Sequence, residues 1–227
     1  MSEQEGRAEN DANSPQDFPG ANPAWTDVPQ HLLGTSPYRS ICRIHAYRNG
    51  NRIAEGTGWL AQGGRVVTAA HVAFSAERCE MQFAGTQTWV NSVNIRIHPA
   101  YRRPNGGVTE GSPADLARID LAAPMANGLN VAAFAHGAVM AIGYDGNRLV
   151  QHSGAAYPWE SYLLHAAHTD AGHSGCPVLS GGQVVGVHVS ARGTAEAYFA
   201  APSPAGPSLL NAAIKFDAQS LRFLNGL

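Results

Sequence analysis

The chain has 227 residues, of which 44% are hydrophobic and only 14% are charged, and its formal net charge is −2. This balance excludes the basic field that attracts nucleic acid or anionic membranes, and no apolar run reaches the roughly 20 residues that span a bilayer. Its 25 glycines and 14 prolines, set among short apolar stretches, favour a loop-rich β protein over a helical bundle.

The first 27 residues hold six carboxylates against one arginine and almost no aliphatic side chains. This composition predicts disorder up to about Trp25, and it lacks the basic start and apolar core of a secretory signal. We assign residues 1–34 to a disordered acidic tail or a removable pro-segment. The alternative is a tail through which a regulatory partner binds.

Only three cysteines occur, at Cys42, Cys79 and Cys176. Their odd number and wide spacing indicate neither a disulfide framework nor a metal-binding C-x-x-C pair. Together with the missing signal, this favours a reducing, cytoplasmic location, with secretion as the alternative.

The first half of the chain reads as a series of short strands. Residues 38–50 alternate apolar and polar positions and end at Asn49-Gly50, a strong hairpin signal. Further strands are expected at 55–60, 65–68, 81–83, 89–98 and 116–119, with a turn-rich loop over 99–113.

A second series of short strands begins near Gly137, at 138–146, 149–157, 161–167, 176–190 and 197–201, and a Pro/Ser/Gly loop follows at 202–207. The period then changes to a helical stripe that ends at Gly226 and contains Leu210, Ile214, Phe216, Leu221 and Leu224. We therefore expect an all-β protein of two six-stranded antiparallel β-barrels with the active site in the cleft between them. The expected units are a first barrel at 35–127, a second at 128–208, and a helix at 209–227 packed on the barrels.

Two residues of the first half suit acid–base chemistry. His71 ends an apolar strand among small residues, which leave space for a substrate beside a general base. Asp115 precedes an apolar strand, where a buried carboxylate needs hydrogen-bond donors. Taken alone, His71 could instead be a histidine packed in the core, and Asp115 could instead be a turn or strand-cap aspartate. Asp120 is the competing carboxylate and should face the other side of its strand.

Ser174 lies in "DAGHSGCPV", flanked by glycines that permit positive φ and the close approach of a substrate. The amides of Gly172 and Ser174 could together hold an oxyanion. The alternative is a glycine-rich hairpin turn. The order His71, Asp115, Ser174 is that of the chymotrypsin type of triad, split between the two expected barrels.

On these residues the chain resembles the trypsin/chymotrypsin-fold serine endopeptidases, and within them the bacterial glutamyl endopeptidases of the V8-like subgroup. The similar stretches include "GTGWL", "VVTAAHV", "ADLARIDL", "HSGCPV" and "VVGVHVS", spread over residues 35–225. The resemblance implies hydrolysis of a polypeptide substrate without a cofactor, with His71 as general base, Asp115 as its orienting group and Ser174 as nucleophile.

The resemblance also implies a preference for cleavage after Glu or Asp, through Thr169 and His188. Both side chains can donate to a carboxylate without a permanently buried charge. The subgroup often places the mature amino terminus in this pocket. Because 34 residues precede "TSPYRS" here, either they are removed or that charge is missing, and His168 is a candidate substitute.

The chain departs from the family at four positions. Gly56 and Val72 replace a cysteine pair, His173 replaces Asn, Gln or Asp before the nucleophile, and Cys176 replaces a small residue. We interpret Cys176 as a buried packing residue.

Three alternatives remain. His165, His168, His173, His188 and Cys176 could form a metal site, but His165 and His168 would point apart in a strand. The chain could be a catalytically silent protease-like binding module, or an active protease with non-acidic specificity. The sequence leaves the oligomeric state open.

Overall fold

The computed structural model describes residues 25–102, 114–190 and 210–226. The expected strand at 197–201, the loop at 202–207 and most of the loop at 99–113 lie outside the described residues. None of the described helices is long and apolar enough to cross a membrane.

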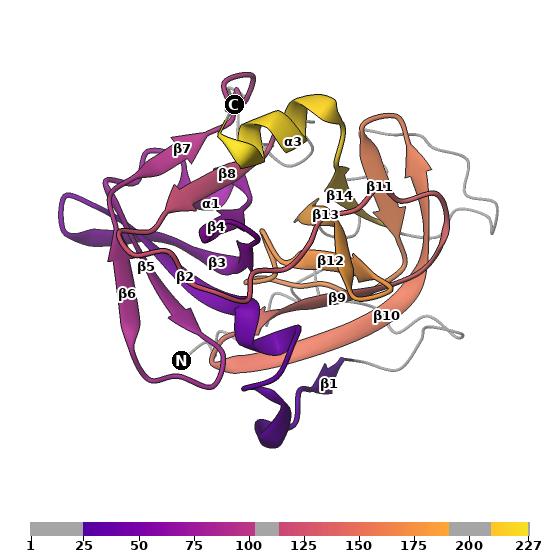
Figure 1. Ribbon diagram of the computed structural model, residues 1–227, viewed down its shortest axis with the longest axis horizontal. Helices are drawn as coiled ribbons and strands as arrows, with labels where there is room; N and C mark the ends of the chain where they lie inside the picture. The colour runs from indigo at the N-terminus through magenta and orange to yellow at the C-terminus, as the bar shows by residue number, and fades with distance from the viewer. Residues whose placement is uncertain (1–24, 103–113, 191–209, 227) are drawn as a thin grey trace, which may run out of the picture.

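The first half forms one antiparallel sheet that curls on itself (Figure 1). Its strand order is β6-β5-β2-β3-β4-β8-β7. The strands are β2 (Ile41–Arg48), β3 (Asn51–Ala61), β4 (Arg65–Thr68), β5 (Arg78–Phe83), β6 (Trp89–Ser92), β7 (Ile95–Ile97) and β8 (Ala117–Asp120). The expected hairpin at Asn49-Gly50 joins β2 to β3, and both residues have positive φ.

The strand expected at 89–98 is two strands, β6 and β7, which pair with different partners, β5 and β8. The hydroxyl of Ser92 donates to Asp120 O (2.7 Å) and accepts from Asn94 N (3.1 Å) at the break. These two hydrogen bonds replace β-sheet hydrogen bonds at the point where the chain stops pairing with β5 and starts pairing with β8.

The second half is a closed antiparallel barrel of β9 (Gly137–Asp145), β10 (Arg148–Trp159), β11 (Tyr162–His165), β14 (Asn211–Lys215), β13 (Gln183–Ser190) and β12 (Pro177–Ser180). Pairing of β9 with both β10 and β12 closes it. The two-barrel, mostly β architecture is therefore confirmed. The first half is a curled seven-stranded sheet whose edge strands, β6 and β7, do not pair with each other, rather than a closed six-stranded barrel; we call it the first barrel.

The expected carboxy-terminal helix is present but shorter. Residues 211–215 form β14 because they pair with β11 and β13. Ala213 packs in an apolar cluster of the second half, whereas Ala212 and Ile214 pack in a cluster that also contains first-half residues. The helix α3 (Ala218–Asn225) begins after Asp217, whose carboxylate accepts from the amides of Gln219 and Ser220. It lies over β8 (Figure 1), where the Arg118 guanidinium donates to Phe223 O at 2.9 Å.

Part of the expected tail is packed against the second barrel. The short strand β1 (Thr26–Asp27) pairs with β10, Val28 N donates to Leu149 O (2.9 Å), and the 3-10 helix η1 (Gln30–Leu32) follows. The packed chain therefore begins before the expected boundary at residue 34. We call residues 25–33 the strap.

A shared apolar core joins the two halves. It contains Trp59, Val67 and Leu116 from the first half with Ile142 and Val187 from the second. The segments that follow β4, precede β8 and precede β12 consequently meet at the boundary between the halves.

Candidate active site

His71 and Asp115 form a doubly hydrogen-bonded pair. His71 lies on α1 (Ala70–Ala73), a single helical turn directly after β4, and Asp115 lies two residues before β8. The Asp115 carboxylate accepts from His71 N (2.9 Å) through Oδ1 and from His71 Nδ1 (2.7 Å) through Oδ2. Asp115 is fully buried, whereas the His71 side chain is 18% exposed. The buried carboxylate thus fixes the imidazole and leaves Nε2 as the nitrogen that can take a proton.

The competing carboxylate lies elsewhere. Asp120 is surrounded by three guanidinium groups, at N–O distances of 3.3 Å to Arg65, 3.6 Å to Arg118 and 3.8 Å to Arg96. It therefore belongs to a charge cluster at the end of β8.

The turn that carries Ser174 is held by the opposite barrel through Thr57. Thr57 Oγ1 donates to Gly172 O (2.7 Å), and Thr57 N donates to Ser174 O (2.9 Å). The same hydroxyl accepts from Tyr144 N (2.8 Å). Thr57 is fully buried, so water cannot replace these bonds. In the sequence Thr57 stands only within "GTGWL", and its place between two glycines is the one local signal of a close approach.

Two glycines allow this turn to lie against the segment that carries His71. A Cβ atom on Gly56 would lie 2.8 Å from Ser174 O and 2.8 Å from a methyl group of Val72, the neighbour of His71. A Cβ atom on Gly175, which has φ of +87°, would lie 2.1 Å from Thr68 Oγ1. The structure therefore brings the Ser174 turn and the His71 helix to one place on β3, although their sequence separation is about a hundred residues.

Two main-chain amides of the turn remain available. Among the described residues, neither Gly172 N nor Ser174 N donates to any acceptor, whereas His173, Gly175 and Cys176 all donate to carbonyls. Gly172 adopts φ of +94°, and a Cβ atom there would lie 2.5 Å from Tyr144 O. The arrangement can accept an oxyanion at these two amides.

His188 lies directly behind the turn. Its amide donates to Cys176 O (2.9 Å), and its carbonyl accepts from Gly175 N (2.8 Å). Burial lowers the pKa of His188 well below its ordinary value, and the imidazoles of His165, His173 and His71 lower it further. The imidazole is therefore neutral near pH 7 and carries one N–H.

Thr169 and His188 each bury a polar atom that has no partner. Both residues are buried, and among the described residues neither Thr169 Oγ1 nor His188 Nδ1 has a hydrogen-bond partner. Trp59 Nε1, His173 Nε2 and Asn211 Oδ1 have the same property, so it is common to several buried side chains of the described residues. A ligand or water can complete the bonding of such atoms.

His168 faces other groups. Its amide donates to His152 Nδ1 (2.8 Å), and its ring makes an edge contact with Trp25 at 5.1 Å between centroids. These contacts do not support its expected role as a pocket charge, which stays a prediction.

Cys176 and the histidines give no metal site. Cys176 is fully buried, burial raises the pKa of its thiol, and it packs against Ala141 and Ala167. Within residues 25–102, 114–190 and 210–226, no three His, Cys, Asp or Glu side chains are grouped to bind a metal ion.

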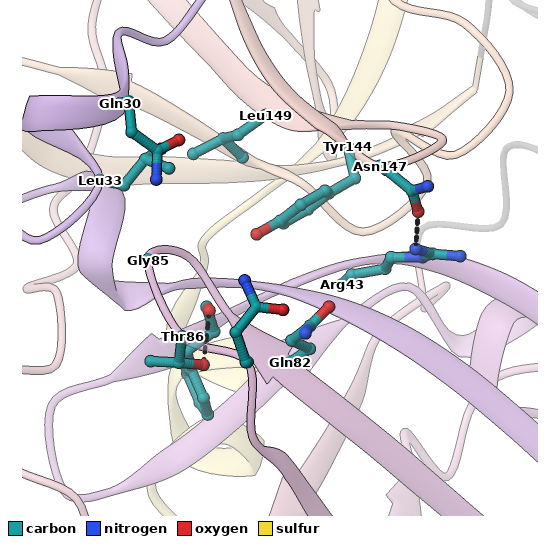
Figure 2. A pocket seen from close by; sticks show the side chains of 11 residues that line it. Gln30, Leu33, Arg43, Gln82, Gly85, Thr86, Tyr144, Asn147 and Leu149 are labelled. Atoms are coloured by element: carbon teal, nitrogen blue, oxygen red, sulfur yellow. Dashed lines mark hydrogen bonds between the residues drawn. The ribbon is translucent and has the colours of Figure 1, made fainter.

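A separate cavity of about 420 Å³ lies between the strap, the β5–β6 turn and the β9–β10 hairpin. Figure 2 shows Gln30 and Leu33 on one side of it and Tyr144, Asn147 and Arg43 on another. His71, Asp115 and Ser174 are not among the residues that line this cavity; Tyr144, whose amide donates to Thr57 Oγ1, forms part of its wall.

No protein-family model matches the chain, and no curated protein sequence matches it. Solved structures do. An astrovirus serine protease from a human pathogenic virus is 21% identical over 79% of this chain and 90% of its own, with a TM-score of 0.55. A serine endoprotease from Yersinia pestis is 15% identical over 88% of this chain and 67% of its own, with a TM-score of 0.62. The Rv3671c protease of M. tuberculosis is 16% identical over 90% of this chain and 98% of its own, with a TM-score of 0.58. At these identities the likeness concerns the fold: the chain has the two-barrel fold of the trypsin-like serine proteases.

Proposed function

We propose that the chain is a serine endopeptidase with His71, Asp115 and Ser174 as its catalytic triad. The observation that carries the proposal is the buried Asp115 carboxylate, which accepts two hydrogen bonds from His71. A carboxylate used only as a turn residue has no need to fix an imidazole that is partly open to solvent. The similarity of fold to solved serine proteases supports the same chemistry.

The proposed reaction is acyl transfer in two steps. The Ser174 hydroxyl attacks the peptide carbonyl carbon while His71 Nε2 takes its proton, and Asp115 stabilises the imidazolium through Nδ1–H. The oxyanion rests on the amides of Gly172 and Ser174 until the C–N bond breaks and His71 protonates the leaving amine. Water, deprotonated by His71, then hydrolyses the acyl-enzyme. The sequence of steps uses no cofactor.

We further propose cleavage after Glu or Asp. In the tautomer with the proton on Nδ1, His188 can donate to a carboxylate, as can the Thr169 hydroxyl, and neither group leaves a fixed charge buried when the pocket is empty.

Covalent labelling with a fluorophosphonate tests the activity. We expect the full-length protein to be labelled at Ser174 and the Ser174→Ala variant, folded alike, to remain unlabelled. Absence of labelling and of peptide cleavage in folded protein would leave a silent binding module as the better description.

A peptide library tests the specificity separately. If Ser174 is labelled but the enzyme shows no preference for Glu or Asp before the scissile bond, the role proposed for His188 and Thr169 is wrong and the protease proposal stands.

A further inference from the structure

The residue before the nucleophile is covered by an aromatic side chain from the far end of the chain. The Trp25 indole lies against the His173 ring, with centroids 4.0 Å apart and planes inclined by 38°. The same indole makes the edge contact with His168 described above. Trp25 therefore contacts both ends of the segment from His168 to His173, directly before Ser174.

His173 is held on its other sides by the second barrel itself. Its Nδ1 lies 3.3 Å from Asp170 N and 3.2 Å from Asp170 O, so one of these groups bonds to it in either tautomer. Its Cδ2 edge packs against Gly143, where a Cβ atom would lie 2.5 Å away. His173 as a whole is 1% exposed. Of the described contacts that fix this ring, the one with Trp25 is supplied by the strap.

We propose that Trp25 is a positioning residue for the nucleophile turn: its indole holds the His173 ring and thereby fixes the main chain of His173 and Ser174. The strap is then part of the working enzyme. This inference rests on the proposed function for its kinetic consequences, while its structural consequence can be measured without activity.

The physical reason is the buried, neutral state of His173. Burial lowers its pKa to about 4, so near pH 7 the contact is a packing of two uncharged rings. Without the indole, one face of the His173 ring is exposed to solvent. Hydration of the exposed imidazole then favours its movement outward, and the adjacent turn moves with it. Because His173 O accepts from Cys176 N (2.8 Å), movement of His173 also releases the turn beyond Ser174.

Substitution at Trp25 leaves the rest of the strap attached. The pairing of β1 with β10 and the Val28–Leu149 hydrogen bond use main-chain atoms. At the other end, Gln30 and Leu33 lie across the cavity from Tyr144 (Figure 2).

The experiment compares Trp25→Ala, Trp25→Phe and Trp25→Leu in the full chain. Trp89→Ala is the matched control, because Trp89 stacks on His45 in the same manner (4.6 Å, 31°) on β6, in the other barrel. The measurements are kcat and KM on one peptide substrate, the fluorophosphonate labelling rate, and hydrogen exchange of the amides of residues 170–176.

For Trp25→Ala we expect roughly a three- to tenfold fall in kcat and labelling rate with little change in KM, since an aromatic pair contributes on this scale. Amide exchange should rise in residues 170–176 and stay unchanged in the first barrel. Trp25→Phe should retain most of the wild-type kcat and of the slow amide exchange, and Trp25→Leu should retain less of both. Trp89→Ala should change neither kcat nor the exchange of residues 170–176.

The outcomes separate the two proposals. Wild-type kcat and unchanged exchange at residues 170–176 in Trp25→Ala would overturn the inference, even if Ser174 is labelled. Faster exchange there, in a protein that no fluorophosphonate labels, would support the positioning role and contradict the protease. If Trp25→Ala fails to fold, Trp25→Leu decides, and wild-type exchange in that variant overturns the inference.

Discussion

The hydroxyl group of Thr57 on β3 lies 2.7 Å from the carbonyl oxygen of Gly172, so a residue of the first barrel fixes a turn of the second. The same residue binds Ser174 O and Tyr144 N. The candidate site is therefore assembled by contacts between the halves, and its geometry depends on their packing.

Thr57→Val keeps the shape of the side chain and removes the hydroxyl, which leaves Gly172 O and Tyr144 N without this partner. We expect unfolding free energy to fall by about 1–3 kcal/mol, the cost of burying unpaired polar groups. Labelling of Ser174 should slow as well. Denaturant unfolding measures the first effect, and Thr57→Ser is the control that should retain both properties; equal behaviour of Val and Ser variants would contradict the role of the hydroxyl.

Asp115→Asn tests the orienting carboxylate. An amide of the same size can donate to His71 Nδ1 and so stabilises the tautomer with the proton on Nε2, which cannot accept from Ser174. We expect kcat to fall on the order of 10³- to 10⁴-fold with little change in KM. Asp120→Asn serves as the control, because the Asp120 carboxylate forms ion pairs with Arg65, Arg96 and Arg118, and a similar loss there would argue against Asp115 as the triad member.

Gly175→Ala tests the close approach of the nucleophile turn to the first barrel. The added Cβ would meet Thr68 Oγ1 and Thr57 O, so the turn has to move in addition to adopting a strained φ. Gly50→Ala is the matched control, with φ of +77° and open space around its Cβ. We expect Gly50→Ala to lose about 1–2 kcal/mol of unfolding free energy, the cost of the strained φ. Gly175→Ala should lose clearly more, and its Ser174 should no longer be labelled. Thermal and denaturant unfolding of the two variants check this, and equal losses would show that the contact is unimportant.

His188→Val should affect substrates with an acidic residue before the scissile bond. Loss of a buried donor to a carboxylate reduces the preference for Glu over Gln by roughly ten- to a hundredfold. The measurement is the ratio of kcat/KM for a matched Glu and Gln peptide pair. A uniform fall for both peptides would assign His188 a structural role instead.

The buried histidines predict acid sensitivity. Burial lowers the pKa of His165 and His173 from 6.5 to about 4, and that of His188 well below 6.5. Between about pH 6.5 and 4 the unfolded chain thus binds protons that the folded chain does not, so unfolding free energy decreases as pH falls. Each histidine contributes about 1.4 kcal/mol per pH unit within its window.

Unfolding titrations between pH 4.5 and 7.5 measure this slope. His165→Gln should make the slope shallower, whatever its effect on stability at pH 7.5. Identical slopes in the wild type and the variant would contradict the prediction.

The sequence by itself determined the mostly β, two-unit architecture, the Asn49-Gly50 hairpin, and the His71, Asp115, Ser174 order. These follow from local signals: period-two alternation, turn residues, and residue types whose chemistry is specific. Residues 210–216 show the limit of such signals, since their apolar pattern fits a helix as well as a strand. Pairing with β11 and β13 made residues 211–215 a strand.

Only the tertiary structure decided which groups hold the turn that carries Ser174. Thr57 is 115 residues from Gly172, and nothing in the neighbourhood of either residue in sequence specifies the other. The same holds for Trp25 and His173: composition assigned Trp25 to the end of a disordered tail, and the family resemblance marked His173 only as a departure from the family pattern. Side-chain contacts between distant segments depend on how two barrels pack, and that packing is a property of the whole core rather than of any local stretch.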